Sequence, residues 1–270
     1  MMPEDTGIEL SKYRGLIIDL DGVVWLDNKI IYKADETISY LKNAGMKLVF
    51  ISNTSTKSMA KMMKKINNLN LPINNNEVVL ASRESVKYVS NLNSGNNNVY
   101  IIGSEGLKRE AAGFGLNVIS DEQVKYSRVD FVLVGWDSRI NALKLKNALN
   151  AILKGAKFVA INKDPTHPGK NDIRPATGAI VGAVEAMVDK EPDILVGKPE
   201  TYLLNIGLNR LNLSKEAVAI VGDTLSSDIK AGKNIGIDTI LVLTGNTSSD
   251  RISYNVAPDY IIESISDLLD

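Results

Sequence analysis

Short apolar runs alternate with amphipathic segments in the first part of the chain. An apolar run at residues 16–20 is followed by a helical pattern at 35–43, and a second apolar run occupies 46–51. A polar cluster at 52–58 then opens a segment with methionines and an isoleucine at helical spacing. Short aliphatic runs that alternate with helices are typical of buried parallel strands joined by crossover helices. The pattern predicts a β-α-β-α arrangement around a parallel sheet.

The same alternation resumes after an Asn-rich stretch and continues almost to the end of the chain. In the middle part we expect strands at 99–103, 117–119, 129–136 and 157–161 and helices at 104–115 and 142–156. In the last part we expect helices at 179–188, 201–211 and 226–236 and strands at 217–223 and 238–245. We therefore predict an α/β fold, with a doubly wound, Rossmann-like parallel-sheet core of residues 1–82 and 182–270 interrupted by an inserted smaller α/β domain of residues 83–181.

Composition narrows the class of protein. Of the 270 residues, 44% are hydrophobic and 23% are charged, which is ordinary for a globular protein. The formal net charge of -1 provides no bulk attraction to nucleic acid or to a membrane surface, so we expect neither as a partner. The absence of cysteine excludes disulfides, thiolate catalysis and cysteine-based zinc sites. No signal peptide and no membrane-spanning apolar run are visible, and we expect a cytoplasmic location.

Two aspartates, Asp19 and Asp21, lie at the end of the first predicted strand in the sequence Asp-Leu-Asp-Gly. Functional groups in open parallel sheets gather at the carboxyl ends of the strands. Two carboxylates placed so close together repel each other, and a hard cation such as Mg²⁺ between them would relieve the repulsion. Taken alone, the pair is equally compatible with a solvated Asx turn.

Polar side chains follow three further apolar runs. Asp223 ends the run at 217–223, and Asp228 follows at the opening of a predicted helix, where it could equally serve as an N-cap. Ser52 and Asn53 follow the second strand, where small polar groups form either an anion cradle or a capping cluster. Lys198, in Val-Gly-Lys-Pro, is by itself compatible with an ordinary surface lysine.

The joint pattern is more specific than any one motif. If each of these groups lies just past a separate strand of one sheet, all of them meet at the same edge. Carboxylates for a metal ion, together with a hydroxyl and an ammonium for phosphoryl oxygens, are the groups that phosphoryl transfer requires. The sequence therefore predicts a phosphoryl-transfer site.

In order and spacing these motifs resemble those of the haloacid dehalogenase superfamily of phosphatases. Asp-Leu-Asp-Gly-Val at 19–23 resembles the first motif of the family, Ser52 the second, Lys198 the third and Gly-Asp-Thr-Leu-Ser-Ser-Asp at 222–228 the fourth. The long insert between the second and third motifs resembles the α/β cap of the NagD-like and p-nitrophenyl phosphatase subfamily. The resemblance covers nearly the whole chain.

The resemblance implies a magnesium-dependent phosphoric monoester hydrolase that acts on small phosphate monoesters, such as sugar, glycerol, glycolate or nucleotide phosphates, through an aspartyl-phosphate intermediate. In that scheme Asp19 is the nucleophile and Asp21 is the general acid and base. Mg²⁺ is held by the Asp19 carboxylate, the Asp21 backbone carbonyl and Asp223, and Asp228 acts through water or by orienting Lys198.

The resemblance also implies groups that bind the substrate. The expected phosphate-binding residues are Gly22, Ser52, Asn53 and Lys198. The loop at 162–174 is the candidate for specificity, with Asn162 and Asp164 as substrate-binding residues and His167 as either a substrate contact or a solvated histidine. The expected partner is a small phosphorylated metabolite, and a homodimer through the cap stays open.

Two other functions use the same motifs. A phosphomutase would share the core chemistry but pass the phosphoryl group to a second sugar hydroxyl instead of water. A non-catalytic phospho-ligand-binding protein would have lost at least one motif residue, and none is lost here. A haloacid dehalogenase would need neither Asp21 nor a magnesium site.

Overall fold

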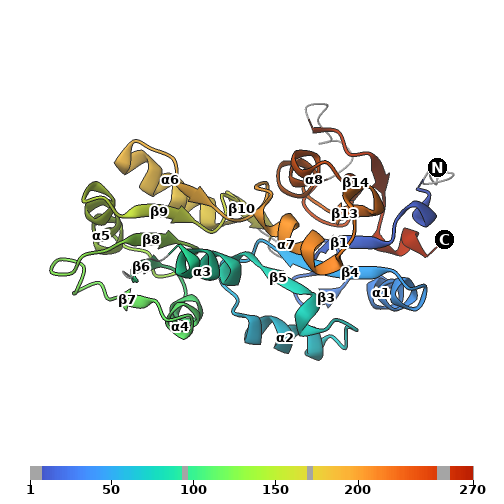
Figure 1. Cartoon of the computed structure of the whole chain (residues 1–270), viewed down its shortest axis with the longest axis horizontal. Coiled ribbons are helices and arrows are strands. Elements are labelled where there is room, and N and C mark those ends of the chain that lie inside the picture. Colours follow the sequence, from blue (N-terminus) through green and yellow to red (C-terminus); the bar gives the residue numbers. More distant parts are fainter. Residues whose placement is uncertain (1–7, 93–96, 169–172, 248–255, 270) are drawn as a thin grey trace. The chain divides into compact units, whose positions relative to one another are not determined.

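The computed structural model describes residues 8–92, 97–168, 173–247 and 256–269. The chain divides into two compact units, each with its own sheet (Figure 1). The first unit comprises residues 1–52, 63–79 and 198–270, and the second comprises 53–62 and 80–197. None of the helices among the described residues is long and apolar enough to cross a bilayer.

A six-stranded sheet forms the centre of the first unit, in the order β15-β14-β13-β1-β4-β5. Its strands are β1 (Gly15–Asp19), β4 (Lys47–Ser52), β5 (Val78–Leu80), β13 (Val218–Gly222), β14 (Asp238–Val242) and β15 (Tyr260–Ile262). The five strands from β15 to β4 are parallel to one another. Every residue of β1 is buried, because a central parallel strand is covered on both faces and its apolar side chains can fill both. The parallel direction brings the carboxyl ends of these strands to one edge of the sheet.

Helices surround this sheet and a small hairpin follows its central strand. The helices are α1 (Ala34–Asn43), most of α2 (Met59–Asn68), α7 (Tyr202–Leu211) and α8 (Lys230–Ile235). Helix α7 packs on β1 and β4, and α8 packs on β14 and on α7. The hairpin consists of β2 (Trp25–Leu26) and β3 (Lys29–Ile30), paired antiparallel. It lies a few residues beyond the carboxyl end of β1, so it is tied to the edge that carries Asp19.

The second unit has a five-stranded parallel sheet in the order β12-β9-β8-β6-β7. Its strands are β6 (Asn98–Ile102), β7 (Asn117–Ile119), β8 (Phe131–Val134), β9 (Lys157–Ala160) and β12 (Ile194–Leu195). Its helices are α3 (Ala81–Asn91), α4 (Glu105–Gly113), α5 (Ala142–Leu153) and α6 (Thr177–Val188). Buried apolar side chains of β6, β8 and β9 pack with those of α5 and α6 into one core. The predicted combination of a parallel-sheet α/β core with an inserted smaller α/β domain is confirmed.

The boundaries of the inserted unit differ from the predicted 83–181. Residues 182–197 belong to the second unit, because α6 packs against α5 and β8 and because β12 pairs with β9. A boundary at residue 181 would have cut α6 in two. Residues 53–62 and 80–82 also belong to the second unit.

Several elements carry too weak a pattern to be predicted. The strands of the β2–β3 hairpin and β12 are only two residues long. Helix α3 buries the polar residues Ser82, Glu84 and Ser85 beside apolar ones, so its buried face is mixed and its pattern is weak. The helix predicted at 226–236 is a π-helical turn at Leu225–Ile229 that continues into α8.

Candidate active site

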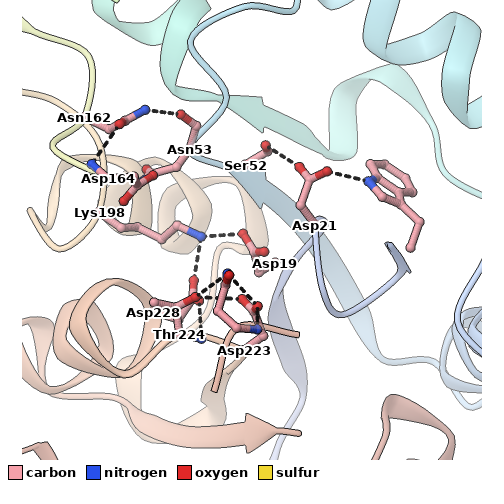
Figure 2. Close-up of polar contacts among 12 residues, drawn as sticks. Asp19, Asp21, Ser52, Asn53, Asn162, Asp164, Lys198, Asp223, Thr224 and Asp228 are labelled. Carbon is pink, nitrogen blue, oxygen red and sulfur yellow. Dashed lines mark hydrogen bonds and ion pairs between the residues drawn. The ribbon is translucent and has the colours of Figure 1, made fainter. Parts of the chain in front are cut away.

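Three carboxylates meet at the carboxyl edge of the first sheet. Asp19 is the last residue of β1, Asp223 directly follows β13, and Asp228 lies in the π-helical turn. Strands β1 and β13 are neighbours, so their ends deliver Asp19 and Asp223 side by side. One oxygen from each of the three carboxylates lies within 4.8 Å of the others, and all three residues are buried (Figure 2).

Glycines allow the backbone to approach these carboxylates. Gly22 has a φ of 89°, a conformation that L-residues rarely adopt, and a Cβ there would collide with the Asp223 carboxylate. A Cβ at Gly222 would likewise overlap the side chain of Asp228. In the structure Gly22 lies beside Asp223, and its predicted contact with phosphate stays a prediction.

Lys198 is the cation of this cluster. Its ammonium is buried, forms an ion pair with Asp19, and forms a second with Asp228 at 2.5 Å (Figure 2). Burial alone would lower the pKa of Lys198, but the charges of Asp19 and Asp228 raise it above the usual value for lysine. Lys198 therefore remains protonated and compensates part of the negative charge.

Lys198 supplies one positive charge for the three carboxylates of the cluster. Burial raises the pKa of Asp19 well above its usual range, and the charge of Lys198 offsets only part of that effect. Burial, together with the charge of Asp228, raises the pKa of Asp223 to about 7. Hard oxygen ligands with an excess of negative charge are the donor set that Mg²⁺ prefers, so these residues fit that ion.

Residues that the sequence analysis did not single out orient two of the carboxylates. The backbone and side-chain amides of Asn246 donate to Asp223 Oδ2 at 2.6 and 2.9 Å. The Thr224 hydroxyl donates to Asp223 Oδ1 at 3.0 Å, and its backbone N–H donates to Asp228 Oδ2 at 3.1 Å. Asn246 follows β14 in the chain, so applying the strand-end argument to that strand as well would have found it.

Asp21 lies apart from the three clustered carboxylates. Its side chain is 52% exposed, in contrast to the buried Asp19. The Ser52 hydroxyl, at the end of β4, donates to Asp21 Oδ2 at 3.3 Å, and the Trp25 indole donates to Asp21 Oδ1 at 2.8 Å (Figure 2). The structure thus brings Asp21 together with Ser52, the residue predicted to hold phosphate.

The other predicted binding residues belong to the second unit and contact one another there. Asn162 donates its side-chain amide to the backbone carbonyl of Asn53 at 2.6 Å, and the Asn53 side chain donates to Asp164 Oδ2 at 3.0 Å. His167 lies exposed on β10 (Thr166–Pro168), paired in register with Arg174 of β11 (Ile173–Pro175). Contacts of these residues with substrate stay a prediction. Part of the predicted loop, 169–172, lies outside the described residues.

Family models match both ends of the chain. A haloacid dehalogenase-like hydrolase model matches residues 16–117, and a second HAD-like hydrolase model matches residues 195–268. These two segments contain Asp19, Ser52, Lys198 and Asp223. Asp19, Ser52 and Asp223 lie at strand ends of the first sheet as predicted, whereas Lys198 follows β12 of the second sheet, so its predicted place past a strand of the same sheet is wrong.

Relatives cover nearly the whole of this chain. An acid sugar phosphatase from Staphylococcus epidermidis is 34% identical over 258 residues, which cover 95% of this chain and 97% of the relative. A p-nitrophenyl phosphatase from Archaeoglobus fulgidus has the same fold with a TM-score of 0.87 and 32% identity, covering 96% of this chain and 98% of its own. A glycerol phosphate phosphatase from Mycobacterium tuberculosis in complex with magnesium has a TM-score of 0.85 and 25% identity, covering 99% of this chain and 78% of its own. The chain belongs to the family of haloacid dehalogenase-like hydrolases, among its phosphatases.

Proposed function

We propose that the protein hydrolyses small phosphate monoesters in two steps through a phosphorylated Asp19, with Asp21 as general acid and then general base. The observation that carries this proposal is the buried cluster of Asp19, Asp223 and Asp228 around Lys198, whose carboxylates exceed its cations. The membership of the chain among HAD-like phosphatases supports the same reaction class.

In the first step a carboxylate oxygen of Asp19 attacks phosphorus, and the bond from phosphorus to the leaving oxygen breaks. Asp21 gives a proton to that leaving oxygen, so that an alcohol departs in place of an alkoxide. Lys198 and the Ser52 hydroxyl hold phosphoryl oxygens, which places positive charge and a donor where negative charge develops.

In the second step a water molecule attacks the phosphorus of the phosphorylated Asp19. Asp21, now ionised, accepts a proton from that water, which restores its acid form. The bond between phosphorus and the Asp19 oxygen breaks, inorganic phosphate leaves, and the Asp19 carboxylate is regenerated. The exposure of Asp21 supports this role, because a group that exchanges protons with substrate and water has to be reached by both.

The same residues would hold Mg²⁺. The side chains of Asp19, Asp223 and Asp228 and the backbone carbonyl of Asp21 are the proposed ligands, directly or through water. A bound Mg²⁺ offsets the repulsion between a carboxylate nucleophile and a phosphate dianion. Lys198, between Asp19 and Asp228, keeps both of these carboxylates in place.

The proposed substrates are phosphate esters of small polyols and sugars. This class is supported by relatives that are named as phosphatases of sugars, of p-nitrophenyl phosphate and of glycerol phosphate. These names describe those proteins, and the natural ester of this chain is proposed only at the level of the class.

A phosphate-release screen tests the proposal. The purified chain is given sugar phosphates, glycerol phosphate, glycolate phosphate, nucleoside monophosphates and p-nitrophenyl phosphate, with Mg²⁺ or with a chelator. We expect one inorganic phosphate for each alcohol released, only with Mg²⁺, and no release by Asp19→Asn. Isomerised sugar phosphate without free phosphate would indicate a mutase, and inactivity on every ester would overturn the proposal.

A further inference from the structure

The Asp21 carboxylate is held from the side of the β2–β3 hairpin. The Trp25 indole nitrogen donates to Asp21 Oδ1 at 2.8 Å. Trp25 is completely buried, and its backbone carbonyl accepts a hydrogen bond from Gly22 N at 2.7 Å. The indole donor therefore comes from a rigid position, although the carboxylate that it contacts is half exposed.

Lys65 of α2 reaches the same oxygen. Its ammonium lies 3.9 Å from Asp21 Oδ1 and 4.1 Å from the centre of the Trp25 ring. It also donates to the backbone carbonyl of Asp27, in the turn of the hairpin, at 2.6 Å. The lysine side chain is only 13% exposed. Three contacts thus fix the ammonium over the indole face and next to the carboxylate.

The two oxygens of Asp21 consequently have different surroundings. Oδ1 faces Trp25 and Lys65, whereas Oδ2 accepts a hydrogen bond from the Ser52 hydroxyl at 3.3 Å. Ser52 is a proposed ligand of the phosphoryl group. Oδ2 is therefore the oxygen on the side where the leaving group and the water would be.

We propose that Trp25 and Lys65 are positioning residues that anchor Asp21 Oδ1, so that the proton of each step passes through Oδ2. This inference rests on the proposed function. In the first step the Oδ2–H bond breaks and an O–H bond to the leaving group forms. In the second step a water O–H bond breaks and the Oδ2–H bond forms again, while Oδ1 makes and breaks no covalent bond.

The physical reason for such an anchor is the exposure of Asp21. A half-exposed carboxylate with no fixed donor would rotate among its staggered rotamers and would often point away from the substrate. Misplacing a reacting group by about 1 Å can cost on the order of 10²-fold in rate. A hydrogen bond from the indole N–H and the nearby charge of the Lys65 ammonium restrict this freedom at Oδ1, while Oδ2 stays on the side of Ser52.

The test compares two leaving groups. Trp25→Phe keeps an aromatic ring beneath Lys65 and removes the N–H donor, and Lys65→Met keeps an apolar stem and removes the charge. For each variant kcat/KM is measured with glycerol phosphate, whose alkoxide needs a proton, and with p-nitrophenyl phosphate, whose phenolate leaves without one. We expect about a tenfold or larger loss with glycerol phosphate, a part of the roughly 10²–10⁴-fold effect of a general acid, and a loss several-fold smaller with the aryl ester.

Controls separate this role from a structural one. Trp136→Phe removes the N–H of the other tryptophan, which lies in the second unit, and leaves the ratio of the two kcat/KM values unchanged. Lys65→Arg restores a cation and returns the ratio toward that of the wild type. Equal losses on both esters in Trp25→Phe and Lys65→Met, or no loss on either, would overturn the anchor. If Trp25→Phe does not fold, the comparison of Lys65→Met with Lys65→Arg tests the proposal.

Failure of the anchor is distinguishable from failure of the proposed function. Asp21→Asn reports the role of Asp21 itself, and it should show the largest selective loss on glycerol phosphate. If Asp21→Asn loses kcat/KM equally on both esters, the proposed acid role of Asp21 is wrong, and so is the positioning role of Trp25 and Lys65. If Asp21→Asn loses more kcat/KM on glycerol phosphate than on the aryl ester, but Trp25→Phe and Lys65→Met do not, only the positioning role of Trp25 and Lys65 is wrong. In the Asp21→Asn background Trp25→Phe should not change the ratio further.

Discussion

Each unit of the molecule has a buried lysine paired with aspartate beyond the carboxyl end of a central parallel strand, but the balance of charges differs between the two units. In the first unit Lys198 forms ion pairs with Asp19 and Asp228, and Asp223 completes the cluster. One ammonium therefore faces three carboxylates. Burial, together with the charges of the neighbouring carboxylates, raises the pKa values of Asp19 and Asp223.

In the second unit the arrangement is balanced. Lys144 pairs with one carboxylate, that of Asp137, at 2.6 Å, and also donates to the backbone carbonyl of Arg139 at 3.1 Å. The other Asp137 oxygen accepts the backbone N–H of Arg139 at 2.8 Å. Each charge has its counter-charge and further hydrogen bonds, so this pair needs no ion and fixes the loop after β8.

The comparison shows which property distinguishes a candidate catalytic edge from a structural one. A lysine–aspartate pair beyond the end of a buried strand occurs at the carboxyl edge of both sheets. The excess of buried negative charge occurs at the first only, among the described residues. Burying charge without compensation is costly, so a cluster that keeps such an excess is expected to bind a cation when it functions.

Removing the nucleophile should have the largest effect. Asp19→Asn keeps the size of the side chain but lacks the charge needed to attack phosphorus, and we expect kcat to fall on the order of 10⁴-fold or more. Thermal unfolding should show that the variant is folded. Retention of most of the wild-type phosphate release would show that Asp19 is not the nucleophile.

Breaking the balanced pair should affect stability instead. Lys144→Met leaves the buried Asp137 carboxylate without its counter-charge, and we expect a loss of about 3–5 kcal/mol in the free energy of unfolding. Adding Asp137→Asn, which keeps an acceptor for the Arg139 N–H, should recover most of that loss. Urea denaturation measures both variants. If the double variant is no more stable than Lys144→Met, the pair is not a self-sufficient structural contact.

The effect of Mg²⁺ on stability should depend on pH. Without metal, folded Asp223 keeps its proton up to a pKa of about 7, whereas an unfolded aspartate releases it near 4, so the stability of the metal-free protein falls as pH rises between these values. Mg²⁺ requires the ionised carboxylate and competes with that proton. At pH 8, Mg²⁺ at 100 times its dissociation constant should add about 2.7 kcal/mol to the free energy of unfolding, and the same Mg²⁺ concentration should raise Tm less at pH 5.5, where the proton competes.

A magnesium-induced rise in Tm that is equal at both pH values would contradict this coupling. The same scan on Asp137→Asn provides the control, because that carboxylate lies in the balanced pair. Its Mg²⁺ response should match that of the wild type at each pH.

The strand-end residues were predictable from sequence for a physical reason. Carboxyl ends of parallel strands share one edge, so Asp19, Ser52 and Asp223 could be grouped once their apolar runs were identified as strands. The same argument covers the two-unit α/β fold, because the central strands of both sheets are short and largely buried. These inferences need only local patterns and the rule that such strands run parallel.

The supporting residues could not be predicted in that way. Trp25 lies in a two-residue strand and Lys65 on a helix forty positions later, and only the folded chain brings both to Asp21. The end of the inserted unit at residue 197 could not be predicted either. The two-residue strand β12 is too short to be recognised in the sequence, and its pairing with β9 is seen only in the folded sheet. Contacts between positions distant in the chain leave no periodic signal in one sequence.

Isothermal titration of Mg²⁺ into the metal-free protein tests the central claim most directly, because it measures whether the excess of buried negative charge binds a cation. The account predicts one Mg²⁺ per chain in the wild type and in Asp137→Asn, and at least a tenfold weaker affinity in Asp223→Asn, roughly 1.4 kcal/mol or more. Wild-type affinity in Asp223→Asn, or weakened binding in Asp137→Asn, would contradict it.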